Sequence, residues 1–247
     1  MKREYLSFIK DKIKIFYTVN DKEYVKETYF GVKKGIGIVS SYFGLNKKLP
    51  AIKVIIAKNR LEYNSFLQHL FKLESSETPL TRIAQVKGNY MLLLSPQSYA
   101  TDSVYVYNRA DYFRLLIHEI IHMVVRIVAG GDDNVPRWFE EGLAVYLSKQ
   151  WLYEDEFKKP IFQKISINRV PSLAKIIRIR RYYYYWGWTI IKYIEKKYGK
   201  KMISEITKKC AQRDIFKILN EKKHLFEQKW KRDLLNNTKE YVLLKKQ

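Results

Sequence analysis

With 247 residues, 47% of them hydrophobic, the chain is long enough for one large domain or two subdomains around a shared core, and its single cysteine, Cys210, excludes an intramolecular disulfide. Its 47 basic and 25 acidic residues give a net charge of +22, which would attract nucleic acid, anionic membrane surfaces or acidic substrates. The basic residues are dispersed along the chain, however, and this favours a general compositional bias over a dedicated polyanion site.

The first third of the chain is predicted to be mixed α/β. Residues 1–15 mix lysines with Glu4 and Asp11 and contain no apolar stretch typical of a secretory signal. Apolar runs and turn signals then predict a β-α-β start followed by a helix and a hairpin at Gly88-Asn89. The expected elements are a strand over 13–19, a helix over 24–43, a strand over 51–57, a helix over 60–73 and strands over 82–86 and 90–94.

The remainder of the chain is predicted to be helical. From about Ala110 the apolar residues recur at helical spacing until Gly130-Gly131 ends the segment. Residues 115–128 are the most apolar stretch, but charged and histidine side chains interrupt it and it is too short to cross a bilayer, so we expect no membrane span. Further helices are expected over 136–150, 184–198, 201–211 and 225–235.

These elements predict an α+β fold. We find no internal repeat and no linker rich in Gly, Ser or Pro, so we expect residues 1–247 to form a single domain. Within it, residues 1–105 would form a small N-terminal α/β lobe with a mixed sheet. Residues 106–247 would form the helical C-terminal lobe.

The segment from His118 to His122 is an H-E-x-x-H motif, and it lies within the predicted helix that begins near Ala110. Residues four apart on a helix share one face, so His118 and His122 can direct both imidazoles at one metal ion. Glu119 points slightly away from that face and can reach a metal-bound water, which gives it the role of general base. The alternative, two buried and hydrogen-bonded histidines with no metal, leaves this spacing unexplained.

A catalytic zinc usually takes a third protein ligand and keeps one position open. Glu141 lies in Trp138-Phe139-Glu140-Glu141-Gly142-Leu143-Ala144, on the second predicted helix of this half. Taken alone, Glu140 and Glu141 could simply favour the positive end of the helix dipole. Gly142 is costly inside a helix, which we interpret as a close approach to the helix that carries His118.

Together these two motifs resemble the gluzincin metallopeptidases, especially the peptidase MA-like group, which pair H-E-x-x-H with a W-x-x-E-G-x-A helix. The resemblance implies a zincin-type active-site helix, with Glu141 as the third zinc ligand and Glu140 as a solvent-facing or neighbouring residue. It implies an oxyanion-stabilising tyrosine at Tyr184, with Tyr183 and Tyr185 as alternatives. It also implies that the strand over 90–94 lies at the sheet edge and pairs with an extended substrate.

The sequence therefore predicts a zinc-dependent metallopeptidase with one zinc ion per chain. It would hydrolyse a peptide or protein substrate through a zinc-bound water that Glu119 activates, in the cytoplasm. The glycine motif of aminopeptidases is not evident, so endopeptidase action is at least as well supported. Two alternatives stay open: an amidase acting on a non-peptide bond, and a non-enzymatic zinc protein whose basic surface binds nucleic acid or another polyanion.

Overall fold

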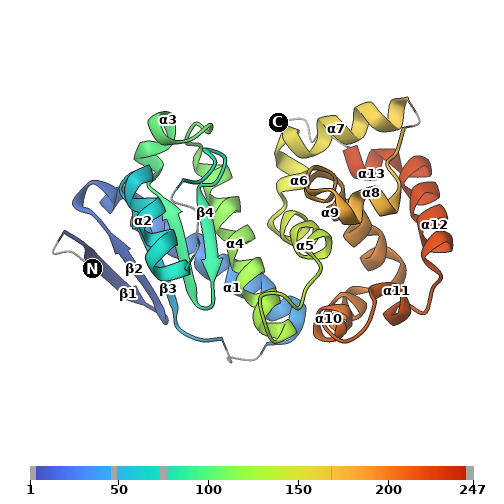
Figure 1. Ribbon diagram of the computed structural model, residues 1–247, viewed down its shortest axis with the longest axis horizontal. Coiled ribbons are helices and arrows are strands. Elements are labelled where there is room, and N and C mark those ends of the chain that lie inside the picture. The colour runs from blue at the N-terminus through green and yellow to red at the C-terminus, as the bar shows by residue number, and fades with distance from the viewer. Residues whose placement is uncertain (1–3, 46–48, 73–76, 168, 243–247) are drawn as a thin grey trace. The chain divides into compact units, whose positions relative to one another are not determined.

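The computed structural model describes residues 4–45, 49–72, 77–167 and 169–242 (Figure 1). It has a five-stranded mixed sheet in its N-terminal part and a helical C-terminal part, which confirms the predicted α+β fold class. The chain divides into two compact units: Met1–Ser40 with Leu45–Met123, and Ser41–Gly44 with Val124–Gln247. The expected organisation as a single domain with a boundary near residue 105 stays a prediction.

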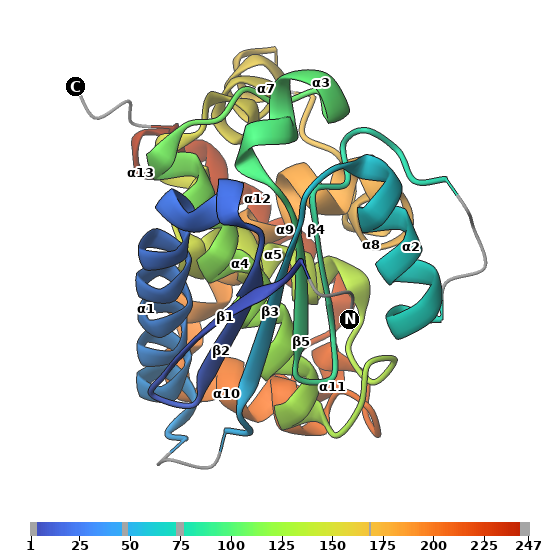
Figure 2. The same cartoon turned by 90° about the vertical axis from the view of Figure 1, so that its left-hand side faces the viewer.

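The first unit is built on the sheet, whose strands follow the order β1-β2-β3-β5-β4 (Figure 2). Its strands are β1 (Leu6–Lys10), β2 (Ile13–Tyr17), β3 (Ile52–Ala57), β4 (Ala84–Lys87) and β5 (Tyr90–Leu94). Strands β2, β3 and β5 are parallel, while β1 and β4 pair antiparallel at the two edges. The expectation that residues 90–94 form an edge strand is therefore wrong, because β4 covers the free side of β5.

Successive side chains of the central strands alternate between the two faces of the sheet, and these faces differ in their surroundings. Ile13, Val54 and Met91 belong to the fully buried face, which is covered by α1 (Val25–Phe43) and by α4 (Arg109–Ala129). The contact between Phe8 of β1 and Tyr29 of α1, with ring centroids 5.5 Å apart, places α1 on this face. Helix α2 (Arg60–Phe71) covers the other face. The short elements η1 (Val19–Tyr24), η2 (Pro96–Ser98) and α3 (Tyr99–Asp102) complete this unit.

The second unit is helical. Its elements are α5 (Arg137–Ser148), α6 (Gln150–Tyr153), α7 (Asp155–Ser166), α8 (Leu173–Arg178), α9 (Arg180–Tyr198), α10 (Lys200–Lys209), α11 (Ile215–Ile218), α12 (Lys223–Asn236) and α13 (Thr238–Val242). The helices expected over 136–150, 184–198, 201–211 and 225–235 correspond to α5, α9, α10 and α12. None of the helices in the described ranges combines the length and apolar character that a bilayer crossing requires.

Helices α5 and α9 cross at two glycines. A Cβ atom built on Gly142 would lie 2.5 Å from the backbone carbonyl carbon of Gly187, which is closer than real Cβ contacts. The expectation that Gly142 permits a close approach between helices was thus correct, but the expected partner helix was wrong. The glycine accommodates α9 instead of the helix that carries His118.

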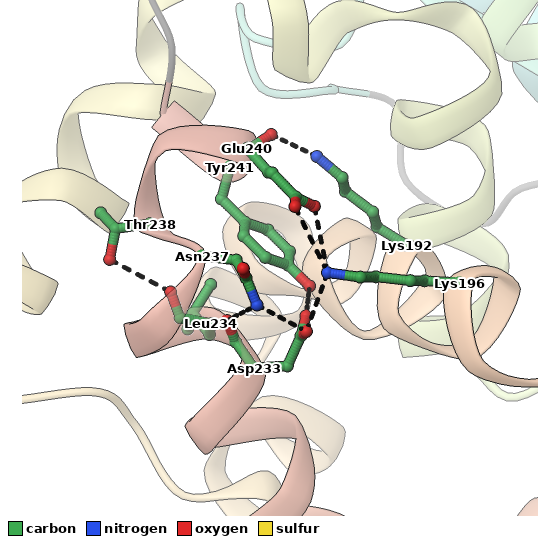
Figure 3. Close-up of polar contacts among 8 residues, drawn as sticks. All are labelled: Lys192, Lys196, Asp233, Leu234, Asn237, Thr238, Glu240 and Tyr241. Atoms are coloured by element: carbon green, nitrogen blue, oxygen red, sulfur yellow. Dashed lines mark hydrogen bonds and ion pairs between the residues drawn. The ribbon is translucent and has the colours of Figure 1, made fainter.

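A polar cluster joins the C-terminal helices to α9 (Figure 3). Lys196 Nζ lies 3.0 Å from Asp233 Oδ1 and 3.2 Å from Glu240 Oε2, and the Tyr241 hydroxyl donates to Asp233 at 2.5 Å. Lys192 donates to the backbone carbonyl of Glu240, and its ammonium lies 4.6 Å from the centre of the Tyr241 ring. These contacts attach α12 and α13 to the core of the second unit.

Candidate metal centre

Helix α4 carries the H-E-x-x-H motif, as predicted. Asn108 Oδ1 accepts hydrogen bonds from the backbone N–H groups of Ala110 and Asp111, which satisfies donors that the first turn leaves without helical partners. At the other end Gly130 adopts φ +79°, a left-handed conformation that stops the helix. The 21-residue helix thus places the motif at its middle, where its backbone is most regular.

Close packing on α1 holds the motif's segment of α4. A Cβ atom on Gly31 would lie 2.5 Å from Leu116 Cδ1, and one on Gly35 would lie 2.9 Å from Ile120 Cβ. The two glycines therefore let the helices approach to a distance that any larger residue would prevent. Next to this contact His118 is 4% exposed and His122 is 5% exposed. Two buried imidazoles need polar partners or a metal ion to offset their lost hydration.

The two imidazoles are directed at one another. His118 Nε2 and His122 Nε2 are 2.9 Å apart, and the ring planes meet at 72°. Two nitrogens bound to one tetrahedral zinc ion at about 2.05 Å would be separated by about 3.3 Å, so a small rotation of either side chain accommodates the ion. The i, i+4 spacing has produced the convergence that the sequence predicted.

Glu141 of α5 completes the candidate ligand set. One ligand atom from each of His118, His122 and Glu141 lies within 4.8 Å of the other two. Among the described residues this is the group of His, Cys, Asp and Glu side chains with the spacing of a metal site. Two neutral imidazoles and one carboxylate are a donor set that zinc uses in catalytic sites, so the residues present fit the predicted ion.

Glu119 is also buried, with 8% of its surface exposed. Its charge lies near the hydroxyl of Tyr63: burial raises the pKa of Tyr63 most strongly, and the Glu119 carboxylate raises it further. Tyr63 therefore stays protonated at any physiological pH. The phenol therefore adds no charge of its own near the Glu119 carboxylate.

A buried ion pair, absent from the sequence prediction, connects the end of α4 to α5. Arg126 Nε lies 2.6 Å from Glu140 Oε1, and the partly exposed Arg137 lies 3.0 Å from Glu140 Oε2. Glu140 is fully buried, so the idea of a solvent-facing residue is wrong. Arg126 stands four residues after His122, and Glu140 immediately precedes Glu141. An arginine on the apolar face of a predicted helix was the available signal for a buried partner.

The three candidate tyrosines lie at the start of α9 in different surroundings. Tyr184 packs on Phe157 with ring centroids 5.6 Å apart, and on Tyr185 at 5.9 Å. Burial raises the pKa of Tyr183, and the Glu141 carboxylate raises it further. The Tyr183 phenol thus lies close enough to the predicted zinc ligand for its ionisation to respond to the Glu141 charge.

Comparison with known proteins gives little beyond a distant relative. No protein-family model matches the chain. The chain is 26% identical over 212 residues to the uncharacterized protein YhcO of Bacillus subtilis (strain 168). The similarity covers 82% of this chain but 62% of YhcO, so the chain spans less than two thirds of that relative's length.

Proposed function

We propose that the protein is a zinc-dependent metallopeptidase whose ion is held by His118, His122 and Glu141. The observation that carries this proposal is the convergence of one atom from each side chain to within 4.8 Å. When bound, zinc would polarise the scissile carbonyl as a Lewis acid and make water acidic enough to lose a proton near neutral pH. The donor set itself leaves room for this chemistry, since three protein ligands do not fill a tetrahedral site.

Glu119 is the general base of the proposed reaction. Its carboxylate accepts a proton from the attacking water as the water oxygen bonds to the carbonyl carbon. The same carboxylic acid then donates that proton to the nitrogen of the leaving amine as the C–N bond breaks. Burial of Glu119 supports this role, because a carboxylate with little bulk water around it exchanges protons with the substrate instead of with solvent.

For oxyanion stabilisation we place Tyr183 ahead of Tyr184. The resemblance to gluzincins pointed to Tyr184, whose ring packs on Phe157. The Glu141 carboxylate interacts electrostatically with the Tyr183 phenol, and this nearness to the predicted zinc ligand supports the earlier tyrosine as a hydrogen-bond donor to the substrate. A Tyr183→Phe variant should lose activity by about tenfold to a thousandfold, whereas Tyr184→Phe should lose much less.

The proposed substrate is a peptide or protein, and the proposed compartment is the cytoplasm. A lone cysteine supports the second point, because Cys210 cannot form an intramolecular disulfide. Cleavage within a chain is proposed ahead of cleavage from its amino terminus, since the glycine motif typical of aminopeptidases is not evident in the sequence.

The test is peptidase activity of the Glu119→Gln variant. Glutamine preserves the size of the side chain but cannot accept the proton, so we expect bound zinc to be unchanged and turnover to fall below detection on quenched-fluorescence peptide libraries. Asp133→Asn, at an exposed position, is the matched control and should retain full activity. Peptide cleavage by the Glu119→Gln variant at the wild-type rate would refute the mechanism.

A further inference from the structure

A basic and aromatic pocket, separate from the residues discussed so far, lies on the α2-covered face of the sheet. It belongs entirely to the first unit, and its cavity measures 440 Å³. This volume is within the range of about 300 to 1,000 Å³ that small-molecule sites occupy. The pocket is lined by Lys14, Phe16, Lys53, Ile55, Ser65, Phe66, His69, Leu70 and Tyr90.

Two lysines face each other across adjacent strands of this pocket. Lys14 of β2 is the register partner of Lys53 of β3, and Lys53 is in turn the register partner of Tyr90 of β5. Side chains in directly opposite positions have Cβ atoms about 5 Å apart, and like charges in such positions are destabilising. None of the nine described residues that line the pocket is acidic. An anion between the two ammonium groups would relieve their repulsion.

Aromatic rings hold both ammonium groups at the pocket. Lys53 Nζ donates to the Tyr90 hydroxyl at 2.9 Å and lies 4.7 Å from the centre of that ring. Lys14 Nζ lies 4.8 Å from the centre of the Phe16 ring. Cation–π contacts orient a lysine without neutralising it. The two positive charges therefore stay available for a ligand.

The rest of the wall is apolar and partly exposed. Phe16, Phe66 and Tyr90 are all of intermediate exposure, and Leu70 is 44% exposed. The imidazole of His69 is oriented by its Nδ1, which is 2.7 Å from the backbone oxygen of Ser65 one turn earlier. Flat, partly exposed rings beside positive charges are the combination that binds single nucleotides within a strand, by base stacking and phosphate pairing.

We infer that this pocket binds a nucleotide unit, with its phosphate between Lys14 and Lys53 and its base against the aromatic wall. A free nucleotide and a residue of a single strand offer the same chemistry. The net charge of +22 would help to gather either of them from solution. This inference goes beyond the proposed peptidase function and requires no metal ion.

The experiment measures binding to the intact protein by fluorescence anisotropy and calorimetry. The probes are fluorescein-labelled oligodeoxythymidine and free AMP, with inorganic phosphate and polyglutamate as competitors. The test variant is Lys14→Gln/Lys53→Gln, which keeps much of each aliphatic stem. The control is Lys26→Gln/Lys34→Gln, two exposed lysines of α1, on the opposite side of the sheet, that lower the net charge equally. Circular-dichroism melting checks that both variants are folded.

We expect the test variant to weaken nucleotide binding by about tenfold or more, because two charge-assisted contacts are lost. For the oligonucleotide, the slope of log affinity against log salt should fall by about 0.7, because one phosphate contact is lost. Phe16→Leu should weaken binding as well, since stacking is lost. Binding of AMP identifies the free nucleotide as the ligand, and binding of the oligonucleotide alone identifies the strand.

Three results would overturn the inference. Equal weakening by the α1 control would assign binding to general charge. Competition by polyglutamate as effective as that by oligodeoxythymidine would mean that the pocket does not recognise a base. Undetectable binding of both AMP and the oligonucleotide by the folded wild-type protein would leave the pocket without the proposed ligand.

Discussion

The guanidinium of Arg126 and the carboxylate of Glu140 form an ion pair at 2.6 Å in which the arginine side chain is 10% exposed and the glutamate is fully buried. Both residues are adjacent in the helix to candidate ligands: Arg126 follows His122 by one helical turn, and Glu140 is next to Glu141. The pair thus restrains the segment of α5 that presents the third ligand.

Replacing Arg126 with Met should destabilise the protein by about 3 kcal/mol, because removing one partner leaves a buried carboxylate poorly compensated. Arg137→Met is the matched control on the same carboxylate. The Arg137 side chain is 53% exposed, so its loss should cost about 1 kcal/mol or less. Urea unfolding measures both values. Equal, small losses in the two variants would show that the buried pair contributes no more than the exposed one.

Alanine should have opposite effects at two glycines, Gly142 at the crossing of α5 and α9 and Gly37 on α1. Gly142→Ala should destabilise the protein by about 2 kcal/mol or more, because the new methyl group would lie 2.5 Å from the Gly187 backbone. Gly37→Ala on α1 should stabilise it by about 0.5 to 1 kcal/mol, since nothing lies within 4 Å of that position and alanine favours the helix. Thermal unfolding of the two variants checks the signs, and a stabilising Gly142→Ala would contradict the packing.

The lowered pKa of Lys192 predicts that the protein becomes more stable as the pH rises above about 8. Burial lowers the pKa of this lysine to about 8, against the opposing effect of Glu240 (Figure 3). Above pH 8 the unfolded chain, with an ordinary lysine pKa, holds a proton that the folded state has released. The free energy of unfolding should therefore increase with pH through this range. The buried tyrosines act above the range from pH 8 to 9. The raised pKa of the Cys210 thiol opposes the rise within this range, but it does so equally in the wild type and in a Lys192 variant, so the difference between the two proteins reports Lys192.

The measurement is urea unfolding of the wild type and of Lys192→Met between pH 8 and 9. The variant should lose the upward slope, whereas Lys239→Met, an exposed lysine of α13, should keep it. A slope that persists in Lys192→Met would assign the effect to another group.

The lowered pKa of Glu221 predicts that the protein loses stability in acid. Burial pushes the pKa of this carboxyl up, but hydrogen bonds from Lys229, Tyr198 and Lys197 outweigh burial and lower the pKa to about 2. The stabilisation is complete above the ordinary glutamate pKa and is lost as pH falls through the folded-state value. Glu221→Gln should be less stable than the wild type at neutral pH and should show a flatter acid limb between pH 4.5 and 2. Parallel acid limbs in the two proteins would be inconsistent with this assignment.

Most of the regular elements could be predicted because their patterns were local. The β-branched run of β3 between Pro50 and Asn59 and the apolar spacing of α4 each match one structural period. Strand β1 was missed, since its side chains are mostly exposed and carry no such alternation. Helix α7 was missed because Pro160 lies inside it, and a proline usually ends a helix.

The candidate site likewise contains some residues that local sequence patterns predict and others that they do not. His118, Glu119 and His122 share one helix, so their spacing alone predicts their proximity. Glu141 required the resemblance to a known motif, because no local rule relates α4 to α5. Arg126 and the crossing of Gly142 with Gly187 depend on tertiary packing, which the order of residues does not reveal.

The most direct test of the account is the zinc content of the purified protein before and after Glu141→Ala, with Asp133→Ala as the exposed-carboxylate control. Mass spectrometry of the metal after dialysis should find one zinc ion per chain in the wild type and in the control. Zinc should be lost from Glu141→Ala while that variant stays folded. One equivalent of zinc retained by Glu141→Ala, or none in the wild type after reconstitution, would contradict the proposed centre.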